Sequence, residues 1–253
     1  MNNALPAVGL IGVSDHIGHV RLERPPHNFF SLELINGLAD ALQAYDDEDN
    51  CRVVVISATG KNFCAGADLT TSNTDYTTDE LYAAAVRLFQ TRKPIVAAVH
   101  GAAIGGGLGL CLATDFRIAS PSARFSANFS RLGFHHGFGL SVTLPRLVGE
   151  QNAARLLYTG RRIDGAEALR TGLVDEIADD PLAGAIEFAA EIAASAPLAV
   201  ESIRATLRHD LAGRIADATA HEAAEQIRLR STSDFREGTQ AMAERRQPRF
   251  TRG

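Results

Sequence analysis

The stretch Ala102-Ala103-Ile104-Gly105-Gly106-Gly107-Leu108-Gly109-Leu110 decides the fold of this chain. It follows a strand-like run at 94–100 and leads into a helix-like run at 108–113. Three consecutive glycines between a buried strand and a helix permit φ angles that a Cβ would forbid. They also leave bare N–H groups at the positive end of a helix, where developing negative charge is favoured. The pattern is therefore typical of an oxyanion hole built from main-chain donors.

A second segment, Phe63-Cys64-Ala65-Gly66-Ala67-Asp68-Leu69, lies upstream of the glycine run. Further motifs occur in a regular order along the chain. They are Arg24-Pro25 with Asn28, then 57–60, 94–109, 113–119, 144–149, 159–163 and 166–174. Together these segments resemble the crotonase superfamily, also called the enoyl-CoA hydratase/isomerase family. A glycine triplet alone would be a weak signal, but this many motifs in the right order and spacing make a strong one.

The resemblance implies a fold, an assembly and a ligand. The expected fold class is α/β, with a crotonase-like spiral core of ββα units over residues 1–195 that binds acyl-CoA. Residues 196–253 are expected to form a helical C-terminal region for oligomerisation, giving a homotrimer or a dimer of trimers. The implied ligand is an acyl-CoA thioester, with coenzyme A as part of the substrate and no prosthetic group.

Composition limits the classes of partner. A net charge of −5 and a pI near 5.9 provide no basic surface field, so no nucleic-acid partner is expected. The three cysteines, Cys51, Cys64 and Cys111, form neither a disulfide framework nor a metal-ligand spacing, so no metal site is expected. Such cysteine usage suits a reducing cytoplasm. Residues 1–6 lack the charged n-region of a signal peptide, so a cytoplasmic location is expected.

One uncharged segment has the length of a membrane span. Residues 95–114 number twenty without a formal charge, about the length that crosses a bilayer. The segment contains five glycines and His100, however. Glycine clusters break helices, and the freed backbone N–H and C=O groups then lack hydrogen-bond partners in hydrocarbon. We therefore interpret it as a buried strand, turn and helix, and expect no membrane partner.

Strands and helices are expected to alternate along the chain. Ser31 is a predicted N-cap, and Ile35, Leu38, Leu42 and Tyr45 then recur at helical spacing. Further expected elements are a hairpin strand ending at 20–22, a buried strand at 52–56, a polar loop at 70–78, a helix at about 79–90 and a helix opened by a capping box at 164–167. Beyond residue 197 only helices are expected.

The resemblance assigns the two oxyanion donors to the N–H groups of Ala67 and Gly106. These donors would stabilise the enolate oxygen that develops from a thioester carbonyl. The alternatives are a simple tight turn at Ala67 and close packing of strand against helix at Gly106. Asp68 is expected to cap backbone amides rather than to transfer protons.

A channel for CoA is also implied by the resemblance. Its lining is assigned to Arg24, Ala65, Ala67, Asp68 and Leu69. Phe250 either contacts CoA, in its own or in a neighbouring subunit, or packs a helical terminus.

Three further residues have structural interpretations. We expect His100 to bond to backbone and Asp115 to fix the end of the helix after the glycine run. Cys64 is expected to be a small buried hydrophobe.

The chain departs from the family at both catalytic glutamates. Hydratases of this family place the first glutamate two residues after the glycine triplet, where this chain has Gly109. The second follows the strand that contains Phe125, where this chain has Phe129. Neither residue can move a proton, and each positioned acid–base group contributes about 10²–10⁴-fold. Ordinary hydration is therefore expected to be very weak or absent.

The loop 132–139 offers the candidate replacements. His135 and His136 are candidate acids, bases or hydrogen-bond donors, because the reference pKa of histidine lies near neutral pH. The alternative is that one histidine bonds locally to backbone and the other faces solvent. The pair is not expected to bind a metal, because the sequence suggests no third ligand nearby. The expected acyl pocket is lined by Gly109, Phe129, Phe134 and Phe138. Arg131 either lies at the surface or meets an acidic acyl group.

Three functions follow from these features. The first is an enzyme acting on acyl-CoA with an unusual proton-transfer group. The second is a carrier or sensor that binds acyl-CoA without transforming it. The third is an assembly partner that keeps only the fold.

Overall fold

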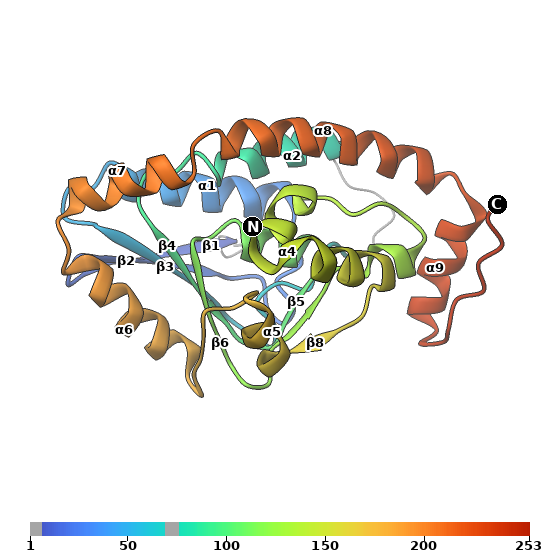
Figure 1. Cartoon of the computed structure of the whole chain (residues 1–253), viewed down its shortest axis with the longest axis horizontal. Helices are drawn as coiled ribbons and strands as arrows, with labels where there is room; N and C mark the ends of the chain where they lie inside the picture. Colours follow the sequence, from blue (N-terminus) through green and yellow to red (C-terminus); the bar gives the residue numbers. More distant parts are fainter. Residues whose placement is uncertain (1–6, 69–75) are drawn as a thin grey trace, which may run out of the picture.

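The chain has a mixed α/β architecture in this computed structural model, which describes residues 7–68 and 76–253 (Figure 1). One sheet has the order β1-β2-β3-β4-β6-β9, with β1 Val8–Ser14, β2 Ile17–Leu22, β3 Val53–Ala58, β4 Ile95–Val99, β6 Phe116–Ala119 and β9 Glu176–Ile177. A smaller sheet has the order β5-β7-β8, with β5 Ala102–Ile104, β7 Arg124–Ser126 and β8 Ile163–Asp164.

The helices cover both faces of the larger sheet (Figure 1). They are α1 Leu32–Asp46, α2 Thr78–Arg87, α3 Gly106–Leu112, α4 Leu140–Thr159, α5 Gly165–Thr171, α6 Pro181–Ala193, α7 Pro197–Leu207, α8 Leu211–Arg230 and α9 Ser233–Ala243, with a 3₁₀ turn, η1, at Asn128–Leu132.

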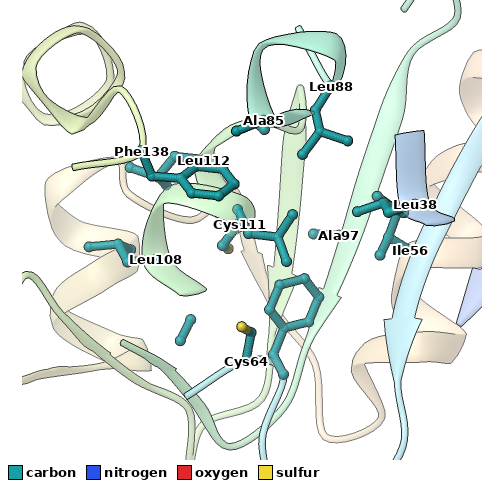
Figure 2. Close-up of a cluster of buried hydrophobic side chains, with 14 of the residues drawn as sticks. Leu38, Ile56, Cys64, Ala85, Leu88, Ala97, Leu108, Cys111, Leu112 and Phe138 are labelled. Atoms are coloured by element: carbon teal, nitrogen blue, oxygen red, sulfur yellow. The ribbon is translucent and has the colours of Figure 1, made fainter. Parts of the chain in front are cut away.

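The central strands are apolar on both sides because helices pack on each face. β3 and β4 are parallel neighbours, as are β4 and β6, and the expected buried strand at 52–56 is confirmed as β3. Val53 and Val55 pack with α6, whereas Val54 and Ile56 face the larger core. In Figure 2, Ile56 lies with Leu38 of α1 and Ala97 of β4. Continuous apolar runs of this kind are typical of parallel strands buried on both faces.

Helix α1 forms as its sequence predicts. The Oγ of Ser31 accepts a hydrogen bond from the N–H of Leu34 at 3.2 Å, which confirms the N-cap. The expected apolar face is buried, because α1 contributes to the larger core with Ile35, Leu38, Leu42 and Tyr45.

Two helix starts differ in detail from the expectation. Helix α2 begins at Thr78, and a complete capping box joins Thr77 and Glu80. At α5, Asp164 accepts from the N–H of Glu167 at 2.9 Å, but the Glu167 carboxylate pairs with Arg161 at 2.5 Å. Only half of the predicted box therefore forms, because the guanidinium offers the carboxylate a charged partner.

The C-terminal helices pack onto the larger core. Beyond residue 197 the described chain consists of α7, α8, α9 and connecting segments without a strand, as predicted. Figure 1 shows α8 extending across the molecule beside α2. Leu211, Ile215 and Ala223 belong to the same apolar cluster as α1 and α3.

No helix within the described ranges is by itself long and apolar enough to span a bilayer. Helices α6 and α7 meet the length and composition criteria only when taken together, and they are bent by 105°.

Candidate active site

The glycine-run turn and the upstream loop are joined by backbone hydrogen bonds. Cys64 forms a parallel bridge to Ala103 in β5. The N–H of Cys64 donates to the carbonyl of Ala102 at 3.0 Å, and the N–H of Ile104 donates to the carbonyl of Cys64 at 3.1 Å. Two segments about 40 residues apart in the sequence are thereby placed side by side.

Glycine is required at two contacts between these segments. Gly66 has a φ of +85°, and a Cβ there would lie 2.7 Å from the carbonyl oxygen of Ile104 and 3.8 Å from the nitrogen of Gly106. A Cβ at Gly107 would lie 2.1 Å from the carbonyl oxygen of Cys64. Such distances leave no space for a side chain, so the close approach depends on both glycines.

The two predicted oxyanion donors lie at this junction. Within residues 7–68 and 76–253, the N–H groups of Ala67 and Gly106 donate no hydrogen bond to the protein. Gly106 is the first residue of α3, and Ala67 directly follows Gly66. Unused backbone donors on two adjoining loops can both contact one oxygen atom of a ligand.

A group of aromatic rings borders the junction. A Cβ at Gly106 would lie 2.0 Å from a ring carbon of Phe30, so this ring lies directly against the turn. The rings of Phe30 and Phe138 are 6.0 Å apart, and those of Phe129 and Phe134 are 5.5 Å apart. Sequence analysis missed Phe30, although its position two residues after the Asn28 motif was a usable signal.

No side chain can be accommodated at position 109 with Phe138 in place. A Cβ on Gly109 would lie 2.5 Å from the Cβ of Phe138. Phe138 is buried, and Figure 2 shows it with Leu108, Cys111 and Leu112 around α3. Phe129 is also buried. The two positions assigned to the family's glutamates are therefore part of an apolar environment.

The two loop histidines contact α8. The Nδ1 of His135 lies 2.8 Å from the carbonyl oxygen of His136, and its ring contacts His221. The Nε2 of His136 lies 2.8 Å from the Oγ of Ser141. In the described chain, no hydrogen bond or ring contact of either imidazole reaches Ala67, Gly106 or Phe138.

His136 is held neutral at physiological pH. Burial lowers its pKa to about 4, and the neighbouring His135 and His221 add to this effect. The Nε2 of His136 also lies 3.8 Å from Oε1 of Glu222, but that carboxylate already accepts hydrogen bonds from the N–H groups of Gly139 and Ser141. Burial outweighs the attraction at this separation, so the imidazole stays uncharged.

Sequence analysis also missed Glu222, which lies on α8 with no exposed surface. Its carboxylate accepts hydrogen bonds from the N–H of Gly139 at 2.8 Å, the N–H of Ser141 at 3.0 Å and the Oγ of Ser141 at 2.7 Å. Burial raises the pKa of Glu222, while these hydrogen bonds oppose the rise. The usable signal was a glutamate within the buried helical stripe of Leu211, Ile215 and Ala223.

Of the residues assigned to the CoA channel, Arg24 and Ala65 are connected by backbone N–H donors to residues 27–28. Asn28 is fully buried, and its amide donates to the carbonyls of Thr59 at 2.6 Å and Asn62 at 2.7 Å. Arg24 is exposed and donates to the Oγ of Ser31 at 2.6 Å, while the N–H of Ala65 donates to the carbonyl of His27.

The remaining channel candidates differ in their surroundings. Ala67 is exposed and Asp68 is half-buried, whereas Leu69 lies outside the described residues. Phe250 is 43% exposed in the C-terminal tail.

The interpretations of His100 and Cys64 are confirmed. Asp115 acts on the end of α3 through its partner Arg208, which donates to the carbonyl of Ala113 at 3.0 Å. The Nε2 of His100 lies 3.1 Å from the carbonyl oxygen of Gly60. Asp115 accepts from the N–H of Ile95 at 2.8 Å and pairs with arginines of α7 and the following turn. Cys64 is fully buried, and burial raises its pKa to about 12. The guanidinium of Arg131 donates to the carbonyl of Thr159 at 2.7 Å from an exposed position.

The described residues contain no group of three or more histidine, cysteine, aspartate or glutamate side chains able to hold a metal ion. The candidate site therefore consists of backbone donors and apolar walls, with a polar cluster on α8 behind one wall.

Comparisons with known proteins agree with this architecture. A family model described as enoyl-CoA hydratase/isomerase matches residues 12–253. A probable enoyl-CoA hydratase of Mycobacterium tuberculosis is 36% identical over 227 residues, covering 87% of this chain and 89% of that protein. A peroxisomal Delta(3,5)-Delta(2,4)-dienoyl-CoA isomerase of Arabidopsis thaliana is 31% identical over 256 residues, covering 92% of each.

A solved structure shows the same fold. The crystal structure of an enoyl-CoA hydratase/isomerase from Pseudoalteromonas atlantica matches with a TM-score of 0.87 and 30% identity, covering 97% of this chain and 100% of that one. The α/β crotonase fold expected from the sequence is thus confirmed. The chain belongs to the enoyl-CoA hydratase/isomerase family.

Proposed function

We propose that this protein binds an acyl-CoA thioester and polarises its carbonyl oxygen between the N–H groups of Ala67 and Gly106. The observation that carries the proposal is that these two donors lie on adjoining loops and donate to no other group of the described chain. Each hydrogen bond to the oxygen would strengthen as negative charge develops on it, which is the condition for catalysis at the adjacent carbon. The names of the relatives support CoA thioesters as the ligand class.

We also propose that proton transfer differs from that of the family's hydratases. Gly109 and Phe129 stand where the resemblance places the two glutamates, and Phe138 fills the space at Gly109. His135 and His136 are the proposed replacements. The neutral imidazole of His136 is in the protonation state that a general base requires. Because His136 contacts α8, the loop 132–139 would have to move for this imidazole to reach the substrate.

A non-catalytic carrier or sensor of acyl-CoA is the second candidate function. It is favoured by the apolar surroundings of Gly109 and by the contacts of both histidines with α8. A purely structural role in an assembly is the third candidate. A homotrimer or dimer of trimers in the cytoplasm is the proposed state for all three.

Binding of a thioester and of its thioether analogue tests the polarisation. Calorimetry with butyryl-CoA and S-butyl-CoA compares ligands that differ only in the carbonyl oxygen. We expect the thioether to bind about tenfold more weakly, because it forgoes two hydrogen bonds. Equal affinities would contradict the oxyanion proposal, and binding of neither ligand would leave only the assembly role.

Turnover separates the enzyme from the carrier. Mass spectrometry on a panel of acyl-CoA thioesters would detect products of isomerisation, decarboxylation or hydrolysis. The proposed enzyme forms product, and His135→Gln or His136→Gln reduces its rate. Tight binding with no product from any thioester would support the carrier instead.

A further inference from the structure

Helix α8 holds the loop that precedes α4. The N-cap of α4 is Gly139, which has no side chain to accept from the first N–H groups of that helix. Glu222 supplies the missing acceptor from 83 residues away, with contacts of 2.8 Å to Gly139 and 3.0 Å to Ser141. The first N–H groups of a helix need such an acceptor, and a carboxylate suits the positive end of the helix.

A second contact from α8 holds the other side of the same loop. The amide nitrogen of Gln226 donates to the carbonyl of His135 at 3.0 Å, and its oxygen accepts from the Oη of Tyr82 at 3.1 Å. A Cβ at Gly137 would lie 1.8 Å from that Tyr82 Oη. The loop is thus held tightly on both sides of Phe138.

Phe138 has a backbone conformation that needs this support. Its φ is +63°, in the left-handed region that residues with a side chain rarely adopt. Such a conformation persists only where surrounding contacts determine it. The contacts here include those of Glu222 and Gln226 on α8 with the residues on either side, and that of the Tyr82 hydroxyl with the backbone of Phe138.

The Phe138 ring connects this support to the candidate site. Its Cβ would be 2.5 Å from a Cβ on Gly109, and its ring is 6.0 Å from that of Phe30. Phe30 in turn lies against Gly106. A displacement of Phe138 would open space beside the position where the resemblance places a catalytic glutamate.

We infer that Glu222 is a positioning residue that, through Gly139 and Ser141, holds Phe138 against Gly109 and so sets which acyl groups the pocket accepts. This inference rests on the proposed function for its ligand class. The hydrogen bonds themselves belong to the fold and can be examined without any ligand.

The variant Glu222→Gln tests the inference with little change of volume. The glutamine amide would replace one acceptor oxygen with an NH₂ group, which cannot accept a hydrogen bond from Gly139 or Ser141. Glu225→Gln is the matched control, because Glu225 lies three residues away on α8, and its carboxylate pairs with Arg228 at 2.6 Å and not with the loop backbone at Gly139 or Ser141. Ser141→Ala removes one of the three hydrogen bonds and serves as a milder variant should Glu222→Gln not fold.

Amide hydrogen exchange without ligand is the first measurement. In Glu222→Gln, exchange over residues 137–142 should be about tenfold faster, with a smaller increase in Ser141→Ala and none in Glu225→Gln. Unchanged exchange in the first two variants would overturn the positioning role, whether or not a thioester binds.

Acyl-chain preference is the second measurement. Calorimetry on CoA, butyryl-CoA and decanoyl-CoA gives the ratio of the two thioester affinities, with CoA as the reference. Glu222→Gln and Phe138→Ala should shift that ratio in the same direction by about tenfold, while the affinity for CoA changes less than about twofold. A ratio that stays constant, or an equal loss for all three ligands, would refute the role in selectivity. If the wild-type protein binds no thioester, the proposed function fails and the exchange result alone decides the positioning role.

Discussion

Asp115 Oδ2 lies 2.9 Å from Nε of Arg204, so the carboxylate that follows α3 is paired with a guanidinium from α7. The other oxygen of Asp115 pairs with Arg208, also at 2.9 Å. All three side chains are largely buried. This ion-pair group joins the C-terminal helices to the end of the segment that carries Gly106.

Replacing Asp115 with asparagine should destabilise the protein by about 3 kcal/mol, because two buried guanidinium groups would lose their counter-charge. Asp40→Asn is the control, since Asp40 pairs with Arg87 at an exposed position and its loss should cost less than about 1 kcal/mol. Denaturant unfolding of the two variants measures the difference. Equal midpoints would show that the buried ion pairs contribute no more than the surface pair.

Gly109→Ala should destabilise the protein by about 1–3 kcal/mol, because its Cβ would overlap the Cβ of Phe138. Gly37→Ala on α1 is the matched control: its Cβ would make an ordinary contact at 3.4 Å with Val8, and helix propensity favours alanine by about 1 kcal/mol. Thermal unfolding should show a lower Tm for the first and an equal or higher Tm for the second. A Tm for Gly109→Ala at or above the wild-type value would mean that Phe138 moves freely.

His136 should make stability fall as pH falls. Its folded-state pKa is about 4 against an ordinary value of 6.5, so the unfolded chain binds the proton first. The free energy of unfolding is unaffected by this group above about pH 7 and decreases through the interval down to pH 4, by about 3 kcal/mol in all.

The raised pKa of Glu222 acts in the opposite direction at acid pH, so the comparison is between wild type and His136→Gln. The variant should show a shallower decrease of unfolding free energy between pH 7 and pH 4. Parallel curves for the two proteins would contradict a neutral, half-buried His136.

Hydration of crotonyl-CoA should be very weak or absent. The positions assigned to the family's acid and base carry Gly109 and Phe129, and each such group contributes about 10²–10⁴-fold. The loss of absorbance of the conjugated thioester measures the rate, with a hydratase that has both glutamates as the positive control. Turnover at the rate of that control would refute the argument from the missing glutamates.

Local patterns in the sequence predicted what depends on near neighbours. The Ser31 cap, the buried strand at 52–56 and the helices after 197 follow from spacing within a few residues, and the structure confirms them. The capping box at Asp164 was only half right. The carboxylate of Glu167 pairs with Arg161 instead of completing the box, and capping rules do not include such a contact.

The sequence by itself identified the fold family, because several motifs, the glycine run among them, occur in the family's order and spacing. The resemblance also placed the loop of Ala67 beside the turn at Gly106, and in the structure an added Cβ on Gly66 would lie 3.8 Å from the nitrogen of Gly106. Only the tertiary structure decided what surrounds that junction. The contact of Phe30 with Gly106, the filling of the Gly109 space by Phe138 and the support of Phe138 by Glu222 join residues 29 to 84 positions apart. No local spacing specifies such contacts, since they arise only when separate helices pack into one core.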